Sequence, residues 1–478
     1  MLDLWKLQTF ISEGASYDSR ARCPPPRCHP GTRAQVLNMI TEWIGDPNPP
    51  QRIFLLSGPA GVGKSAIAQT IAELCRNTHL AASFFFQRNT SDRGVADRLF
   101  LTLAWQLAKS IRRMRPHLGY VLRVGPFKVT HIQTINIQFS RLFLQAFASL
   151  HDDEPGIRPE KNLVIIDALD ECDSERDLKI ILTLIGNALT SRKIPLRFLI
   201  CSRPEPHIQK MFNIDLMNQI TRVVGLDGSN DDIRKYLEDE ILRIFVERPP
   251  PEAGIIDRLV SDASGQFIYA STIIKLLDDP DHDPQEQLDT ILNRPQTSLH
   301  TPLDQLYIQI LSQQSNIRLL RDVLVLVVAF GRVDIKFVCR RLRKTKKDLI
   351  ANLHRIRSIL KISDVAIEAW HISLCDLLQD KKRAGKYYIH PMRVALVRHP
   401  QRMKRKRILI RVCKVVLSPS LLLGYLIAGA VVFRGKMLAI WLGTWLVMPA
   451  AALLCLSRNR ILWMVRRITR KQNTDSAA

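Results

Sequence analysis

The sequence predicts an α/β fold built on a parallel sheet, followed by helical segments and a C-terminal pair of apolar helices. Three observations lead to this fold class: a glycine-rich turn between an apolar run and a helix, further short apolar runs that end in polar residues, and long apolar stretches near the C-terminus. Unbroken apolar runs are typical of parallel strands that are covered on both faces. A chain of 478 residues has room for about two to four domains.

The glycine-rich turn is Gly58-Pro-Ala-Gly-Val-Gly-Lys-Ser65, which follows the apolar run 53–56 and precedes a predicted helix over residues 66–76. Its unpaired backbone amides, at the start of a helix, favour a phosphate group. Lys64 has the reach to contact the β- and γ-phosphates of a nucleotide, and the Ser65 hydroxyl is placed to hold Mg²⁺. The alternative is an ordinary glycine turn. The predicted nucleotide-binding residues are Gly58, Pro59, Ala60, Gly61, Val62, Gly63, Lys64 and Ser65.

A second set of candidate residues stands at the end of the run Leu163-Val-Ile-Ile-Asp-Ala-Leu-Asp-Glu171. Ligands of open parallel sheets bind at the carboxyl ends of the strands. Asp167, at the predicted strand tip, could hold Mg²⁺ directly or through water. Asp170 and Glu171 lie just beyond it, where a carboxylate can orient or deprotonate an attacking water. The alternative is a solvated acidic turn, because exposed acids are the rule.

Three further apolar runs, over residues 80–86, 196–201 and 219–224, complete the predicted sheet. Arg203 follows the second of these runs closely. An arginine at a strand tip can contact a γ-phosphate and report its presence. A surface arginine that is simply followed by Pro204 is the alternative.

Residues 1–28 have no regular pattern, and 333–378 alternate between short helical and extended segments, as in a small helical domain with a β-wing. The thirteen residues of 318–330 are apolar but too few to cross a bilayer. Helical spacing of apolar residues predicts helices over residues 36–44, 96–113, 137–150, 231–246, 255–264, 267–277, 303–313 and 318–330.

The composition, with 46% hydrophobic and 24% charged residues, is that of a globular protein. Nine cysteines without pairing intervals indicate a reducing compartment. The group Cys23-Pro-Pro-Pro-Arg-Cys28-His29 lacks a second ligand pair, so it indicates a proline-stiffened linker and not a zinc site. Residues 1–16 do not have the apolar core and cleavage site of a signal peptide.

The net charge of +24 is concentrated in the C-terminal tail. Residues 393–478 contain 17 Lys and Arg and one acid, Asp475, and so carry +16 of that charge. This tail also holds two uncharged apolar runs, 415–433 and 437–456, of the length needed to cross a bilayer. Together they predict a transmembrane helical hairpin whose basic flanks both face the cytosol. The alternative is a hairpin buried in the core of a helical domain.

These motifs, in this order, resemble those of the fungal NACHT domain proteins of the STAND class, near the nephrocystin-3-like group. The resemblance covers about residues 28–390 and implies an AAA-like P-loop NTPase core, then helical and winged-helix domains. It places the nucleotide-binding domain at 29–225, the helical domain at 226–315 and the winged helix at 316–392, before the basic tail at 393–478. The segments that carry the resemblance are CHPGTR at 28–33, GPAGVGKS at 58–65, LVIIDALDEC at 163–172, RFLICSRPEPHI at 197–208 and SGQFIYAS at 264–271.

The resemblance also implies roles for particular residues. Lys64 and Ser65 would hold the phosphates and Mg²⁺, and Asp167 would be the acid associated with Mg²⁺. Asp170 and Glu171 would be the hydrolysis acids, and Arg203 a sensor. In the segment His371-Ile-Ser-Leu-Cys-Asp-Leu-Leu378 the histidine would hold the ADP β-phosphate, although leucines replace the two phenylalanines of the family pattern.

The predicted function is that of a slow ATPase that acts as a switch, binding ATP or ADP with Mg²⁺ to control conformation, self-association and signalling, for instance in self/non-self recognition. The hairpin places it on a membrane with the nucleotide-binding body in the cytoplasm; a wholly cytoplasmic protein is the alternative. Nucleic acid is not an expected partner, because the basic residues of the tail bracket apolar runs. Two rival functions stay open: a nucleotide-binding scaffold without turnover, and a soluble ATPase that binds nucleic acid through its tail. The sequence does not decide between ATP and GTP.

Overall fold

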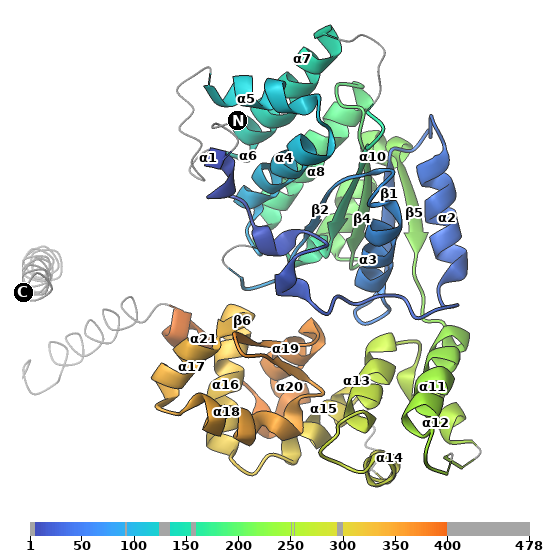
Figure 1. Ribbon diagram of the computed structural model, residues 1–478, viewed down its shortest axis with the longest axis vertical. Coiled ribbons are helices and arrows are strands. Elements are labelled where there is room, and N and C mark those ends of the chain that lie inside the picture. The colour runs from blue at the N-terminus through green and yellow to red at the C-terminus, as the bar shows by residue number, and fades with distance from the viewer. Residues whose placement is uncertain are drawn as a thin grey trace, which may run out of the picture. The chain divides into compact units, whose positions relative to one another are not determined.

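The computed structural model describes residues 5–90, 93–123, 134–153, 159–249, 251–252, 254–293 and 300–398. These residues fall within one compact unit. The described part contains a five-stranded parallel sheet and a three-stranded antiparallel sheet, each joined to helices (Figure 1).

The parallel sheet confirms the strands that the apolar runs predict. Strand β1 lies between β4 and β5, and β3 lies on the far side of β4. The carboxyl ends of β1 and β3 are thus separated by a single strand. In spatial order the strands are β2 (Leu80–Phe85), β3 (Leu163–Asp167), β4 (Arg197–Ser202), β1 (Ile53–Ser57) and β5 (Thr221–Gly225).

Helices cover both faces of this sheet, which is why its strands are apolar without alternation. On β1, Ile53 and Leu55 pack into one core, and Phe54 and Leu56 pack into another. The first core lies against α4 (Leu99–Ser110) and α8 (Glu175–Thr190), and the second against α2 (Ala34–Gly45) and α3 (Lys64–Cys75) (Figure 1).

Further helices extend the first core. The helix predicted over 137–150 is interrupted, because a π-helical turn at Ser140–Gln145 separates α6 from α7. The remaining helices around the sheet are α1 (Trp5–Gln8), α5 (Met114–Arg123), α6 (Ile135–Phe139), α7 (Ala146–Asp153), α9 (Pro206–Phe212) and α10 (Asp215–Ile220).

We call residues 226–315 the helical segment and residues 316–392 the wing segment. The two segments share one continuous apolar core. The helical segment consists of α11 (Asn230–Ile244), α12 (Ile255–Ala263), α13 (Phe267–Leu277), α14 (Pro284–Leu292) and α15 (Pro302–Ser312). The wing segment and the residues after it contain α16 (Ile317–Phe330), α17 (Ile335–Leu342), α18 (Lys346–Leu353), α19 (Ile372–Gln379), α20 (Lys381–Ala384) and α21 (Pro391–Arg398), with an antiparallel sheet ordered β6 (Arg332–Asp334), β8 (Ala366–Ala369), β7 (Leu360–Ile362).

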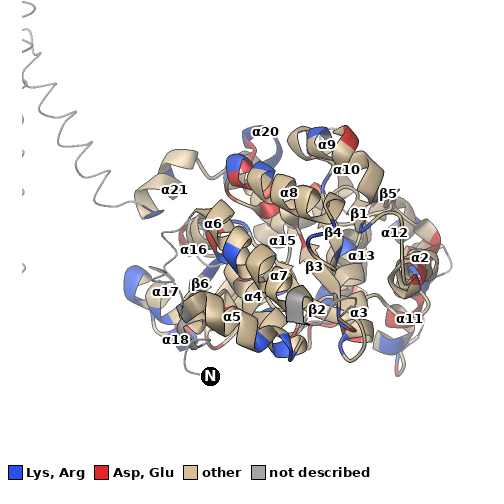
Figure 2. Cartoon of the chain, turned by 90° about the horizontal axis from the view of Figure 1, so that it is seen from above, with Lys and Arg blue, Asp and Glu red and all other residues tan. Residues whose placement is uncertain are grey.

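Lys and Arg residues are frequent on α17, α18 and the turn between them (Figure 2). Helix α17 buries Ile335 and Val338 and exposes its charged side chains. This is the usual division of an amphipathic surface helix.

The structure corrects the prediction of a transmembrane hairpin and of a membrane location. Within the described ranges no helix is both long and apolar enough to cross a bilayer. The apolar helix α16 has 14 residues, about 21 Å of helix against a hydrocarbon core of about 30 Å. It buries nine of those residues in the shared core. The runs predicted to span, 415–433 and 437–456, lie outside the described residues.

A close backbone contact within the helical segment joins the loop after β5 to the turn between α12 and α13, and we expect Gly265→Ala to break it. A Cβ at Gly265 would lie 2.5 Å from the Cα of Gly228, and Gly265 has a φ of +77°. Gly254→Ala is the matched control, because Gly254 also has a positive φ, +90°, but faces open space. Urea denaturation should show a loss of about 1 kcal/mol for the control and about 3 kcal/mol or more for Gly265→Ala. Equal losses would contradict the importance of the contact.

Candidate nucleotide-binding site

The glycine-rich turn joins β1 to α3 and curls around the N-terminus of the helix. Gly61 and Gly63 have φ of +81° and +98°, the left-handed region that glycine adopts without strain. Lys64 begins α3, and its Nζ donates hydrogen bonds to the carbonyl oxygens of Gly58 at 2.6 Å and Pro59 at 2.7 Å. The ammonium group therefore lies directly over the loop. Burial lowers the pKa of Lys64, and the charges of Asp170 and Asp167 act against that shift.

Asp167 stands at the end of β3 and is 3% exposed. Burial raises its pKa, while a hydrogen bond with Ser65 and the charges of Arg22 and Lys64 lower it. The buried Oδ1 atom has no hydrogen-bond partner among the described residues. A buried carboxylate oxygen without a hydrogen-bond partner suits a cation that the Ser65 hydroxyl also holds.

No group of three acidic, histidine or cysteine side chains in the described part of the chain could hold a metal ion. Mg²⁺ does not need one, because it binds through one or two protein ligands and completes its shell with phosphate oxygens and water. Ser65 and Asp167 are such a pair. Bound there, Mg²⁺ would neutralise phosphate charge.

Asp170 and Glu171, which follow Asp167 on a short 3₁₀ turn, have different surroundings. Asp170 Oδ1 accepts a hydrogen bond from the backbone N–H of Arg203 at 2.9 Å, and its Oδ2 lies 3.2 Å from Arg203 Nε. Asp170 is therefore engaged in holding Arg203. Glu171 Oε2 accepts a hydrogen bond from the backbone N–H of Arg88 at 3.0 Å. Burial raises the pKa of Glu171 to about 7, which suits a general base.

Arg203 also reaches the wing segment. Its Nη1 lies 3.0 Å from Oδ2 of Asp376 on α19. Arg88 Nη1 lies 3.7 Å from the other oxygen of Asp376. Two arginines at the edge of the parallel sheet thus converge on one carboxylate of the wing segment, a connection that no local sequence pattern indicates.

His371 is the N-cap residue of α19. Its Nδ1 accepts a hydrogen bond from the backbone N–H of Ser373 at 3.2 Å, so Nδ1 carries no proton and Nε2 must be the N–H of a neutral ring. Burial, together with the charges of Arg203 and Lys64, lowers the pKa of His371 to about 3. The imidazole is therefore a neutral hydrogen-bond donor at physiological pH.

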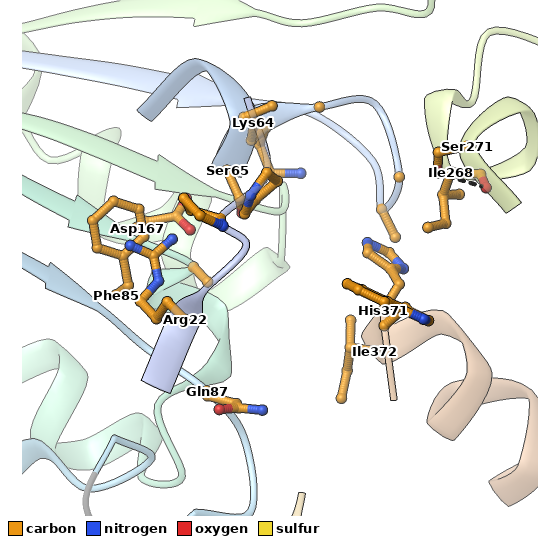
Figure 3. A pocket seen from close by; sticks show the side chains of 18 of the residues that line it. Arg22, Lys64, Ser65, Phe85, Gln87, Asp167, Ile268, Ser271, His371 and Ile372 are labelled. Atoms are coloured by element: carbon orange, nitrogen blue, oxygen red, sulfur yellow. Dashed lines mark hydrogen bonds between the residues drawn. The ribbon is translucent and has the colours of Figure 1, made fainter. Parts of the chain in front are cut away.

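These side chains line one cavity of about 550 Å³, large enough for a nucleotide (Figure 3). The parallel sheet contributes Lys64, Ser65, Asp167, Asp170, Glu171 and Arg203, and the wing segment contributes His371. The structure thus brings together every predicted site residue outside the turn itself. Of the turn, Ala60, Gly61 and Gly63 also line the cavity, whereas Val62 is buried in the core beneath it.

Sequence reasoning assigned no role to several other lining residues. Arg33, in the segment CHPGTR, donates from Nη2 to the carbonyl of Val62 at 2.9 Å and so braces the turn. Lys275 lies 4.7 Å from the ring centroid of Trp370, and burial lowers the pKa of Lys275 to about 8. The sequence could have indicated a role for Arg33, because the segment CHPGTR that contains it occurs together with the glycine-rich turn. Lys275 and Trp370 come from distant elements and carry no such signal.

The parallel sheet, the glycine-rich turn and the acid-tipped strand define a nucleotide-binding P-loop NTPase domain. Residues 31–203 match the family model described as Nephrocystin 3, N-terminal, which confirms the resemblance to the nephrocystin-3-like NACHT group over that segment. A fungal origin is not shown. No curated protein matches the chain significantly.

Three solved structures are similar to part of the chain at low identity. Cdc6p from Pyrobaculum aerophilum is 13% identical, with 72% of this chain and 92% of that chain covered and a TM-score of 0.32. The Aeropyrum pernix ORC1 protein in complex with DNA is 12% identical, with 72% and 90% covered and a TM-score of 0.36. AMPPCP-bound DnaA from Aquifex aeolicus is 14% identical, with 73% and 92% covered and a TM-score of 0.31. TM-scores this low do not establish a shared fold, so the P-loop assignment rests on the site and the family match.

Proposed function

We propose that the protein is a nucleotide-dependent switch that binds ATP or ADP with Mg²⁺, hydrolyses ATP slowly and changes its assembly with the bound nucleotide. In this proposal residues 29–225 are the nucleotide-binding domain, 226–315 the helical domain and 316–392 a winged-helix domain. Lys64 and Ser65 hold phosphates and Mg²⁺, Asp167 completes the metal site, and Glu171 activates water. Asp170 holds Arg203 in place.

The observation that carries the proposal is the ion pair from Asp170 through Arg203 to Asp376. It joins the acid-tipped strand, where a γ-phosphate would lie, to a helix of the wing segment. A γ-phosphate is an anion that would compete with Asp376 for Arg203. Gain of that phosphate would then weaken the contact between Arg203 and Asp376, and its loss would restore it. His371, the N-cap residue of α19, lines the same cavity, so a nucleotide would act on this helix at its start as well as through Asp376.

Asp376→Asn should therefore assemble at lower ATP concentration than the wild type. The pair is partly buried, with 18% and 25% of the two side chains exposed, and its loss should cost about 1–2 kcal/mol, a shift of about 5- to 30-fold in the ATP concentration needed. Analytical ultracentrifugation at a series of ATP concentrations measures the shift. Asp364→Asn is the control, because that exposed carboxylate in the wing segment pairs only with Lys346 in the described structure. An equal shift in both variants, or none in Asp376→Asn, would contradict the switch.

The nucleic-acid alternative depended on the basic tail, of which residues 399–478 lie outside the described residues. It stays a prediction, and salt-dependent affinity for duplex DNA that is lost on deleting residues 393–478 would favour it.

A further inference from the structure

The segment over residues 12–28, here called the strap, is fixed against the parallel-sheet region although its sequence is irregular. The backbone N–H of Tyr17 donates to Ser83 Oγ on β2 at 3.0 Å, and Gln69 Nε2 on α3 donates to the carbonyl of Tyr17 at 3.1 Å. Near its end, the N–H of Cys28 donates to Thr70 Oγ1 at 3.1 Å. The strap therefore crosses the helix that starts at the glycine-rich turn.

This course places Arg22 of the strap inside the nucleotide cavity. Its guanidinium carbon lies 3.4 Å from the ring centroid of Phe85, and Asp167 and Ser65 lie close by (Figure 3). Nη1 donates to Gln69 Oε1 at 2.8 Å. Within the described structure Arg22 forms no ion pair with any acid. Burial lowers the pKa of Arg22 to about 10, and the charge of Asp167 opposes that shift.

Burying part of a guanidinium group without a paired anion costs free energy. An anionic ligand whose oxygens accept its hydrogen bonds offsets that cost. Lys64 marks the position of the β- and γ-phosphates, and Ser65 and Asp167 mark that of Mg²⁺. Arg22 lies on the Asp167 side of this group, where the terminal phosphate would be. Its planar fork suits two oxygens of one phosphate, and Phe85 fixes the plane of the fork.

We propose that Arg22 is a ligand of the γ-phosphate and lets the site distinguish a triphosphate from a diphosphate. The proposal rests on the nucleotide binding proposed above and adds a residue from the chain N-terminal to the matched segment 31–203. Arg203 and Arg22 would contact the terminal phosphate from opposite ends of the site, one from β4 and the other from the strap.

The residues on either side of Arg22 connect the strap to the wing segment. The carbonyl of Ala21 accepts a hydrogen bond from Arg332 Nη1 at 2.7 Å, and the carbonyl of Cys23 accepts one from Lys361 Nζ. Both of these basic side chains also lie near Oε1 of Glu368, at 3.7 and 3.6 Å. A shift of Arg22 toward a γ-phosphate would thus pull on two strands of the antiparallel sheet.

The test compares the affinities of Arg22→Ala and Arg22→Lys for AMPPNP, a non-hydrolysable ATP analogue, and for ADP, by calorimetry on the full chain with Mg²⁺. We expect Arg22→Ala to weaken AMPPNP binding by about 10- to 100-fold and ADP binding by less than about 3-fold. Arg22→Lys should fall between wild type and Arg22→Ala, because lysine keeps the charge and loses the fork. Arg20→Ala is the matched control: this strap arginine is exposed, does not line the cavity and should leave both affinities unchanged.

Equal weakening of AMPPNP and ADP would overturn the proposal and make Arg22 a structural residue of the strap. Unchanged AMPPNP affinity in Arg22→Ala would overturn it as well. If the wild-type chain bound neither nucleotide, the proposed function itself would fail, and this inference with it. Thermal melting of the nucleotide-free variants shows whether Arg22→Ala is folded; if it is not, the AMPPNP-to-ADP ratio of Arg22→Lys decides.

Discussion

Lys64→Ala should lose measurable nucleotide binding, with the affinities for ATP and ADP both falling by about 100-fold or more. Lys64 Nζ already lies over the turn, 2.6 and 2.7 Å from two of its carbonyl oxygens, so its position is set by the loop that would hold the phosphates. It is the cation that faces phosphates shared by ATP and ADP, and charge-assisted hydrogen bonds in a desolvated site are each worth about 1.5–3 kcal/mol.

The binding experiment is calorimetric titration of the full chain with Mg²⁺ and each nucleotide. Lys161→Ala serves as control, because that exposed lysine donates to the carbonyl of Arg76 away from the cavity. Circular dichroism should show the same helical content in both variants. Unchanged affinity in a folded Lys64→Ala would show that the turn is not a phosphate site.

Glu171→Gln should bind ATP within about 3-fold of the wild type and lose hydrolysis by about 100-fold or more, because an amide cannot accept the proton of the attacking water. The substitution keeps the shape of the side chain and an oxygen for the N–H of Arg88. Phosphate release under single-turnover conditions separates the lost chemistry from binding. Glu175→Gln is the control, since that side chain is 70% exposed at the start of α8.

The pKa of Glu171 also predicts in which direction the rate of hydrolysis changes with pH. Burial raises the pKa of Glu171 to about 7, and only its ionised form is a base. Hydrolysis by the wild type should therefore rise as the pH increases through about 7, while the residual rate of Glu171→Gln stays flat over that range. A wild type that holds ADP but releases no phosphate at any pH would favour the scaffold alternative.

The parallel sheet and the glycine-rich turn were predictable because their signals are local. Ile53–Ser57 reads as a buried strand, and the turn that follows has glycines where the backbone has positive φ. Helix α8 carried an equally clear signal, with Leu178, Ile181, Leu182 and Ile185 at helical spacing, yet it was not among the predicted helices. That omission was an error of interpretation and not a limit of the sequence.

Other features of the site depend on contacts that no short stretch of sequence encodes. The pair between Arg203 and Asp376 joins residues far apart in the chain, and Arg22 reaches the cavity only because the strap crosses β2 and α3. Residues 1–28 had no regular pattern and only residues 23–29 were interpreted as a linker, because the backbone of the strap pairs with side chains, such as Ser83 and Thr70, and forms little regular structure. The membrane prediction was wrong: it used hydropathy alone, and no helix in the described ranges is long and apolar enough to cross a bilayer.

The central claim is that one cavity holds a triphosphate between the glycine-rich turn and the tip of β3. A crystal structure of the full chain with AMPPNP and Mg²⁺ tests it most directly. The account predicts that Lys64 Nζ contacts the β- and γ-phosphates and that the metal ion lies between Ser65 Oγ and Asp167. A nucleotide bound elsewhere, or a metal ion remote from both Ser65 and Asp167, would contradict it.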